Sequence, residues 1–293
     1  MADFKLFTDT TCDYPYTYFD EQNIELISHG FTMEGVTIMD DCGRGAYDLP
    51  SVYKRMREEK LLVTTNMPNL DCFLTQFPVH LEQGLDILYL CFSSHLSSTF
   101  MTVHMAAKEL LEKYPERRIA IVDSRCASLG QALFVHKAVA KRAEGASFDE
   151  LIAYCEELRD HILHYFVVDD LDYLHRGGRL SKTAAFVGGL LGMKPILHCN
   201  IDGKILPLDK VRGRKAALDK TISIVADEAV SPQDQIIHVC HADCMEDAQY
   251  VKQQLVERLA PKEVVISPIG PVITAHAGPG TLAIIALGEK RRS

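Results

Sequence analysis

The sequence predicts a two-domain α/β fold, and three observations support that prediction. The chain has 293 residues, more than a typical single domain, so it has enough residues for two cores. Its first half alternates short apolar segments with longer amphipathic ones, as parallel strands joined by helices do. Its second half has a hairpin signal and closely spaced apolar segments, which indicate a mixed sheet. We therefore expect a largely parallel N-terminal α/β domain over residues 1–164, a mixed α/β domain over residues 165–293, and a ligand site between them.

The elements of the first half follow that alternation in order. The start of the chain has the pattern of a first strand. Residues 86–94 and 117–124 predict two further strands, each followed by an amphipathic helix, over residues 99–115 and 130–145. Loops that leave the carboxyl ends of parallel strands gather at one edge of a sheet, where ligands usually bind. Loops of this kind are expected at residues 8–11, 93–98 and 123–130.

The second half predicts a different arrangement. Asp202 and Gly203 stand between two apolar runs, which indicates a tight hairpin turn within residues 196–211. A helix is expected over residues 243–260. Closely spaced strands are then expected over residues 263–270, 271–278 and 281–288.

Composition excludes several classes of protein. Hydrophobic residues make up 47% of the chain and charged residues 24%, which is ordinary for a soluble globular protein. The formal net charge of -9 argues against a general attraction to nucleic acid or to an anionic membrane. The longest apolar run, residues 184–193, is far shorter than the roughly 20 residues of a membrane span. The first residues do not have the pattern of a secretory signal, so we expect a cytoplasmic protein without integral membrane segments.

The nine cysteines are scattered and odd in number, which favours reduced thiols over disulfides. The one cluster that could bind metal lies in residues 238–244, but it lacks a CxxC pair and a matching second half. Strand alternation would put His238 and Cys240 on one face and His241 on the other. We therefore expect no metal site.

Two pairs of hydroxyl residues are candidate anion-binding groups. Thr64 and Thr65 precede a proline-containing loop, and Ser93 and Ser94 stand at a predicted strand end. Such residues commonly cap the next helix, and this structural explanation carries equal weight. No GxSxG elbow is present, but partners of a catalytic triad can be distant in sequence, so a serine hydrolase stays an alternative.

Other motifs carry charge or an imidazole. His276 precedes a Gly-Pro-Gly turn, where it could donate a hydrogen bond to a carboxylate or serve as a structural strand-end residue. Residues 175–195 combine arginines with glycines, but they match neither the GxxxxGK[ST] nor the GxGxxG phosphate signature, so no nucleotide site is expected. Residues 210–215 form a cationic patch, which is either a solvated face or a surface for an acidic partner.

An ordered set of motifs adds a resemblance that covers nearly the whole chain. The set consists of TDTTCDYP, VTTNMP, CFSSHLSSTF, VDSRCASLGQ, LDYLHRGGRLS, GLLGMKPIL, DGKILPLDKVRGRKAAL and HAGPG. In this order the motifs resemble the DegV family of bacterial fatty acid-binding proteins, which includes the binding subunits of fatty acid kinase. The resemblance implies a two-domain α/β fold with a long-chain fatty acid between the domains. It also implies a non-catalytic carrier without a cofactor, which presents the carboxylate to a separate ATP-dependent kinase for acyl phosphate formation in lipid metabolism.

The resemblance also assigns the site. Thr65 and Ser94 correspond to the hydroxyl groups around the carboxylate, His276 to a further hydrogen-bond partner, and Thr64 and Ser93 to their neighbours. Three features depart from the family pattern. They leave the proposed donors in place but leave open the geometry of the head-group site and the preferred acyl chain. They are the TNMP sequence in place of a TSQP-like turn, and His95 and Ser98 in place of glycines.

Simple energetics agree with a carrier. About 15 buried methylenes at roughly 0.8 kcal/mol each contribute about 12 kcal/mol before association costs, whereas one charge-assisted hydrogen bond contributes about 1.5–3 kcal/mol. The tail should therefore dominate affinity and the polar groups orientation. The predicted tunnel or cover residues, which an amphipathic core helix would also explain, are Phe186, Leu190, Leu191, Met193 and Ile196. The predicted kinase-docking residues are Arg176, Arg179, Lys210, Arg212, Arg214 and Lys215.

Two other functions stay open. A lipid sensor would change partners on binding an acyl chain without supporting chemistry. A small-molecule hydrolase or transferase would use His276 with Ser94 or Thr65 as the nucleophile.

Overall fold

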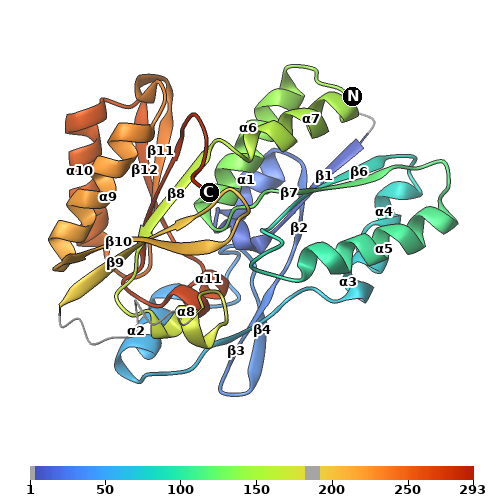
Figure 1. Cartoon of the computed structure of the whole chain (residues 1–293). Coiled ribbons are helices and arrows are strands. Elements are labelled where there is room, and N and C mark those ends of the chain that lie inside the picture. Colours follow the sequence, from blue (N-terminus) through green and yellow to red (C-terminus); the bar gives the residue numbers. More distant parts are fainter. Residues whose placement is uncertain (1–3, 182–191) are drawn as a thin grey trace.

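The N-terminal part of the chain is built on a parallel sheet. The computed structural model describes residues 4–181 and 192–293 (Figure 1). Four parallel strands in the order β2-β1-β6-β7 form the first sheet. These strands are β1 (Phe4–Asp9), β2 (Ile24–Ile27), β6 (Asp86–Cys91) and β7 (Ile119–Asp123). The predicted strands at residues 86–94 and 117–124 are thus confirmed, and the loops after β1, β6 and β7 share one sheet edge.

Helices cover both faces of this parallel sheet. One face packs against α3 (Leu70–Gln76), α4 (Pro78–Leu81) and α5 (Thr99–Lys113), through a cluster of buried aromatic and aliphatic side chains. The other face packs against α6 (Leu129–Ala143) and α7 (Phe148–Leu158). The helices predicted over residues 99–115 and 130–145 are therefore confirmed as α5 and α6. Two short elements, the 3-10 turn Thr10–Cys12 and α1 (Tyr16–Glu21), follow β1.

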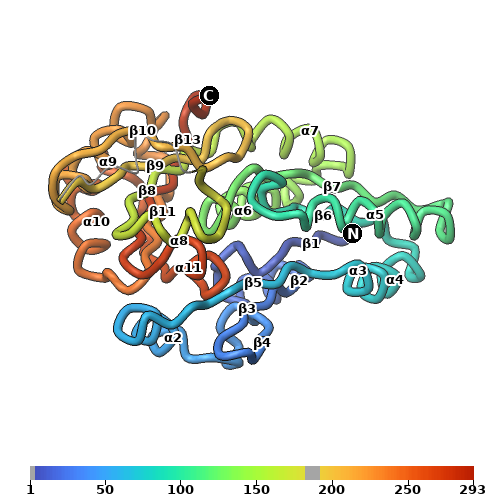
Figure 2. Tube along the Cα trace, turned by 60° about the horizontal axis from the view of Figure 1, so that its bottom comes forward, coloured from blue at the N-terminus to red at the C-terminus, as the bar shows by residue number. Residues whose placement is uncertain are grey.

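A small antiparallel sheet lies below the parallel one in Figure 2. Its strands, in the order β4-β3-β5, are β3 (Gly30–Met33), β4 (Val36–Met39) and β5 (Thr64–Asn66). The helix α2 (Leu49–Glu58) connects β4 to β5, and its buried Val52 and Met56 pack with Phe31 of β3. This sheet places Thr65 beside the C-terminal half of the chain.

The C-terminal part is built on a mixed six-stranded sheet in the order β10-β9-β8-β13-β11-β12. The strands are β8 (Ile162–Val167), β9 (Met193–Cys199), β10 (Ile205–Arg212), β11 (Ile236–His241), β12 (Glu263–Pro268) and β13 (Leu282–Leu287). The predicted hairpin is confirmed, because β9 and β10 are antiparallel and Gly203 has a φ of 84° in the turn between them. One face of the sheet packs against α9 (Arg214–Glu228) and α10 (Met245–Leu259). The predicted boundary at 164/165 falls inside β8, and the division into two domains stays a prediction.

The helix α6 lies between the two large sheets. Most of its residues are buried, and they belong to a single cluster that includes Leu88 of β6 and Phe166 of β8. The two halves therefore share one continuous apolar core. This packing brings the loop edge of the parallel sheet against one face of the mixed sheet.

One predicted strand is wrong. Residues 271–278 form a helix, α11 (Pro271–Ala277), instead of a strand. Pro271 occupies the first helical turn, where its missing N–H has no cost, and Gly278 ends the helix with a φ of 82°. The helix α11 lies beside α8 (Asp172–Arg176) and β5, as Figure 2 shows. His276 consequently projects from a helix toward Thr65.

Candidate functional site

A cavity of about 220 Å³ lies between the mixed sheet and the loops of the N-terminal part. Its floor is one face of that sheet. Phe166 of β8 pairs with Ala283 of β13, which pairs with Cys240 of β11, so their side chains form one row, and Cys199 of β9 lines the cavity beside them. These four side chains are buried. The floor therefore consists mainly of apolar side chains, with two thiols and the ring of His164 on the same face.

The walls come from distant parts of the chain. The helix α11 contributes Val272 and Ile273, the segment at α8 contributes Leu174, and the loop after β6 contributes Phe92 and Leu96. This wall is aliphatic and aromatic. Met67 and Ser98 line the cavity and are exposed to solvent, so the cavity reaches the surface on the side where they lie.

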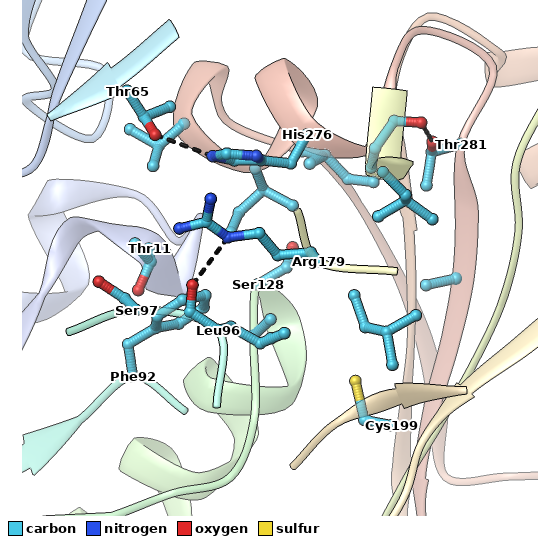
Figure 3. Close-up of a pocket in the computed structure, with 18 of the residues that line it drawn as sticks. Thr11, Thr65, Phe92, Leu96, Ser97, Ser128, Arg179, Cys199, His276 and Thr281 are labelled. Atoms are coloured by element: carbon cyan, nitrogen blue, oxygen red, sulfur yellow. Dashed lines mark hydrogen bonds between the residues drawn. The ribbon is translucent and has the colours of Figure 1, made fainter. Parts of the chain in front are cut away.

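Three of the polar side chains that line the cavity meet toward that side. Thr65 Oγ1 and His276 Nε2 form a hydrogen bond of 2.8 Å, and Arg179 lies next to them (Figure 3). Arg179 Nε donates to the carbonyl oxygen of Leu96 at 2.9 Å. In Figure 3, Cys199 lies across the cavity from Thr65. The Thr65–His276 pair and Arg179 thus lie together on one side of the cavity.

His276 is a neutral hydrogen-bonding group at physiological pH. Its burial, together with the nearby guanidinium of Arg179, lowers the pKa of His276 to about 4. Its Nδ1 is enclosed and has no hydrogen-bond partner among the described residues. A Cβ atom at Gly177 would lie 2.2 Å from that nitrogen, so residue 177 has to be glycine for the ring to keep its place.

Arg179 supplies the charge of the site. It is the one residue with a permanent charge among the described residues that line the cavity. Its burial lowers the pKa of the guanidinium, which still stays protonated because arginine has a very high intrinsic pKa. Arg179, one of the predicted docking residues, follows α8 and lines the cavity, where it can attract an anion. Its part in docking stays a prediction.

The predicted hydroxyl residues fall in different places. Thr64 neighbours Thr65 on β5, so it points the opposite way and is exposed. Ser93 is buried outside the cavity and donates to the carbonyl oxygen of Gly203 at 2.9 Å. Ser94 does not line the cavity, whereas Ser97 of the same loop does. Of the predicted ligand-binding residues, the structure brings together Thr65 and His276.

The comparisons with known proteins agree with this architecture. A family model described as "Uncharacterised protein, DegV family" matches residues 3–289. The chain belongs to the DegV family. A DegV domain-containing protein of Clostridium perfringens is 37% identical to it over 291 residues, which is 99% of each chain.

Solved structures of DegV proteins show the same fold. A DegV-family protein of Ruminococcus gnavus, determined with vaccenic acid, gives a TM-score of 0.87 at 25% identity and covers 98% of this chain and 100% of its own. DegV of Bacillus subtilis, described as a fatty acid binding protein, gives a TM-score of 0.84 at 28% identity and covers 99% of this chain and 100% of its own. Both likenesses extend over the whole α/β architecture described above.

The predicted tunnel residues of this DegV chain are only partly placed. Phe186, Leu190 and Leu191 lie outside the described residues. Ile196 is buried on the α9 side of the mixed sheet and does not line the cavity. Since side chains alternate along β9, Cys199 faces the cavity and Ile196 faces away. Met193, at the start of β9, also lies away from the lining.

The predicted docking residues differ in their surroundings. Arg214 is 20% exposed, and its guanidinium contacts Asp247 at 2.8 Å and Asp169 at 3.6 Å. Lys215 is exposed and contacts Asp219 at 3.1 Å. The remaining exposed residues are Arg176, whose guanidinium lies 4.7 Å from the ring centroid of Tyr173, and Lys210 and Arg212 at the end of β10.

Within residues 4–181 and 192–293, no group of three or more His, Cys, Asp or Glu side chains is arranged to hold a metal ion. In the same part of the chain, every helix is too short or too polar to cross a bilayer.

Sequence reasoning missed several lining residues. Ser128, His29 and His164 all line the cavity, as do both floor cysteines. One of them could have been predicted from the alternation of side chains along β8, because His164 lies two residues before Phe166 and so shares its face. The other positions depend on how the loops of one sheet meet the face of the other, which a local pattern does not encode.

Proposed function

We propose that this protein binds a long-chain fatty acid in the cavity, with its carboxylate beside Thr65, His276 and Arg179. The observation that carries the proposal is the asymmetry of the cavity, with the Thr65–His276 pair and Arg179 toward the open side and a mainly apolar floor inside. The description of DegV of Bacillus subtilis as a fatty acid binding protein supports the same ligand class. The vaccenic acid in the protein of Ruminococcus gnavus does so as well.

Each polar group has a separate task in this arrangement. On binding, the hydroxyl of Thr65 and the Nε2–H of His276 exchange their mutual hydrogen bond for bonds to the carboxylate. Arg179 stabilises its negative charge, because a buried carboxylate without a counter-charge would be costly. The methylene chain then lies over Cys199 and Cys240. Burial of that chain supplies most of the affinity.

We further propose that the protein is a non-catalytic carrier for a separate ATP-dependent kinase. The carboxylate would lie on the side of the cavity that reaches solvent, where a second protein can approach it. The exposed cations Arg176 and Arg212 are candidate contacts for an acidic partner surface. The chain carries no nucleotide signature of its own, so the phosphoryl donor would come from the partner.

Native mass spectrometry tests the ligand. Gently purified protein should carry one long-chain acid, and protein stripped of lipid should take up one equivalent of an added C18 acid. The double variant T65V/H276L should lose at least tenfold in affinity, while T64V, altered at the exposed neighbour on the same strand, should bind normally. Stripped protein that takes up no long-chain acid would refute the proposal.

A hydrolase is the second candidate, because a threonine hydroxyl in contact with an imidazole also occurs in nucleophilic catalysis. In a triad, a third group would orient the other ring nitrogen, but His276 Nδ1 has no partner among the described residues. A carrier needs no such group. Acyl-enzyme formation at Thr65 from an activated ester, detected by intact mass, would favour the hydrolase.

A further inference from the structure

The interior of the cavity contains a polar side chain that a saturated acyl chain cannot satisfy. His164 of β8 lines the cavity and is 6% exposed; its Nδ1 is buried without a partner, and its Nε2 makes no hydrogen bond within the described residues. A buried polar group without a partner costs free energy, and native proteins rarely keep one without a reason. His164 therefore points to a ligand atom.

The surroundings of His164 place it on the inner side of the cavity. Tyr165 pairs with His198 across the antiparallel strands β8 and β9, so His164 lies next to Cys199 on the cavity face. Cys199 lies across the cavity from Thr65 in Figure 3. His164 thus belongs to the side remote from the proposed carboxylate position.

The ring presents one nitrogen to a ligand. Nδ1 is enclosed, and a Cβ atom at Gly130 of α6 would lie 3.1 Å from it. This leaves Nε2 as the nitrogen that a bound molecule can reach. Burial, with a contribution from the nearby Arg291, lowers the pKa of His164 to about 3, so the ring is neutral at physiological pH. Arg291 itself is buried and donates to backbone carbonyl oxygens, among them that of Arg125.

A neutral imidazole nitrogen is a donor in one tautomer and an acceptor in the other. A hydroxyl group can meet either need, whereas a keto oxygen can only accept. A second carboxylate would place an additional charge on an apolar floor. The best complement to His164 is therefore an alcohol on a largely hydrocarbon ligand.

We propose that the cavity selects a long-chain acid that carries a hydroxyl group in the half of the chain remote from its carboxylate, and that His164 Nε2 hydrogen-bonds this hydroxyl. The proposal rests on the proposed fatty acid binding and specifies its ligand class. The carboxylate would bind beside Thr65, His276 and Arg179, and the hydroxyl group on the acyl chain would bind to His164. A site built around such a group binds the analogue that lacks it less well.

The test compares octadecanoic acid with a series of its monohydroxy derivatives, substituted at successive positions along the second half of the chain. Affinities for stripped protein are measured by displacement of a fluorescent fatty acid. We expect one hydroxylated position to bind about 2- to 10-fold tighter than octadecanoic acid, the ratio that one net hydrogen bond supplies. In H164L this preference should disappear.

His238 offers a matched control. It pairs with Ile285 of β13, as His164 does from the other side, and it is buried on the same sheet without lining the cavity. H238L should keep the preference for the hydroxylated acid. If H164L does not fold, the wild-type series still decides, because the proposal requires a hydroxyl preference there.

The outcomes separate this inference from the proposed function. If octadecanoic acid binds and no hydroxylated derivative binds more tightly, the inference is wrong and the fatty acid site stands. A preference that survives in H164L also overturns the inference. Protein that binds none of these acids contradicts the proposed function, and with it the inference.

Discussion

Gly177 and His276 show how one small residue supports the head-group site. The Cβ atom of any larger residue at position 177 would clash with His276 Nδ1. Gly177 itself has a φ of -70°, which every residue adopts readily, so its role is to leave space for the ring. This position therefore separates an effect on the site from an effect on the backbone.

We predict that G177A displaces the imidazole and weakens fatty acid binding by about tenfold, because one hydrogen bond to a charged group is worth about 1.5–3 kcal/mol. Its neighbour is the control. Gly178 has a φ of 71° and open space around its Cβ position, so G178A should cost about 1–2 kcal/mol of stability and leave affinity unchanged. Isothermal titration and urea denaturation of both variants measure the two effects. Equal affinity in G177A and wild type would rule out this role.

The lowered pKa of His276 predicts a pH dependence of stability. The pKa falls from 6.5 to about 4 on folding, so between these pH values His276 is protonated in the unfolded chain and neutral in the folded chain. Above pH 6.5 the ring is neutral in both states and its titration does not affect the free energy of unfolding. As the pH falls from 6.5 toward 4, protonation of the unfolded chain lowers the free energy of unfolding by up to ~3 kcal/mol. Urea unfolding of ligand-free protein across this range should show a smaller decline in H276Q than in wild type. Parallel curves would mean that the ring is not held neutral by the fold.

At the scale of the elements, α8 and α11 explain why sequence reasoning found only part of the site. The apolar run at residues 271–275 suggested a strand, although Pro271 after Gly270 is a helix-start signal. Local sequence singled out Thr65 and His276, which the structure brings together at the cavity, and their role in ligand binding stays a prediction. It could not place Arg179, because the direction of that side chain depends on the packing of α8 against α11.

Arg214, the first residue of α9, forms ion pairs with α10 and with the segment after β8. Through its contacts with Asp247 and Asp169 it neutralises two carboxylates in a half-buried place. We predict that R214M lowers the free energy of unfolding by ~1–2 kcal/mol, since it leaves those carboxylates without their cation. Urea denaturation measures this change, and K215M, at the more exposed neighbour, should cost less. Unchanged stability in R214M would return Arg214 to the candidate docking residues.

The proposed kinase surface needs variants that spare this ion pair. We predict that the double variant R176E/R212E binds fatty acid normally but loses most kinase-dependent acyl phosphate formation, because both exposed cations would repel an acidic partner surface. A K108E/K113E variant of α5 controls for the change in net charge. Undiminished acyl phosphate formation in R176E/R212E would exclude this surface from docking.

At the scale of the whole molecule, the sequence predicted the two sheet types, the order of most strands and helices, and a site between the two halves. It did not predict that α6 is buried between both sheets. The amphipathic pattern marks the apolar residues of this helix but not the two sheets that they meet, because its partners come from strands far apart in sequence. The shared core fixes the loop edge of one sheet against the floor of the other, and the cavity is what remains between them.

The most direct test of this account is a crystal structure of the protein with a bound long-chain fatty acid. We expect the carboxylate within hydrogen-bonding distance of Thr65 and His276, near the guanidinium of Arg179. We also expect the hydrocarbon tail to lie over Cys199 and Cys240. A carboxylate bound at the inner side of the cavity, or a fatty acid bound elsewhere on the molecule, would contradict it.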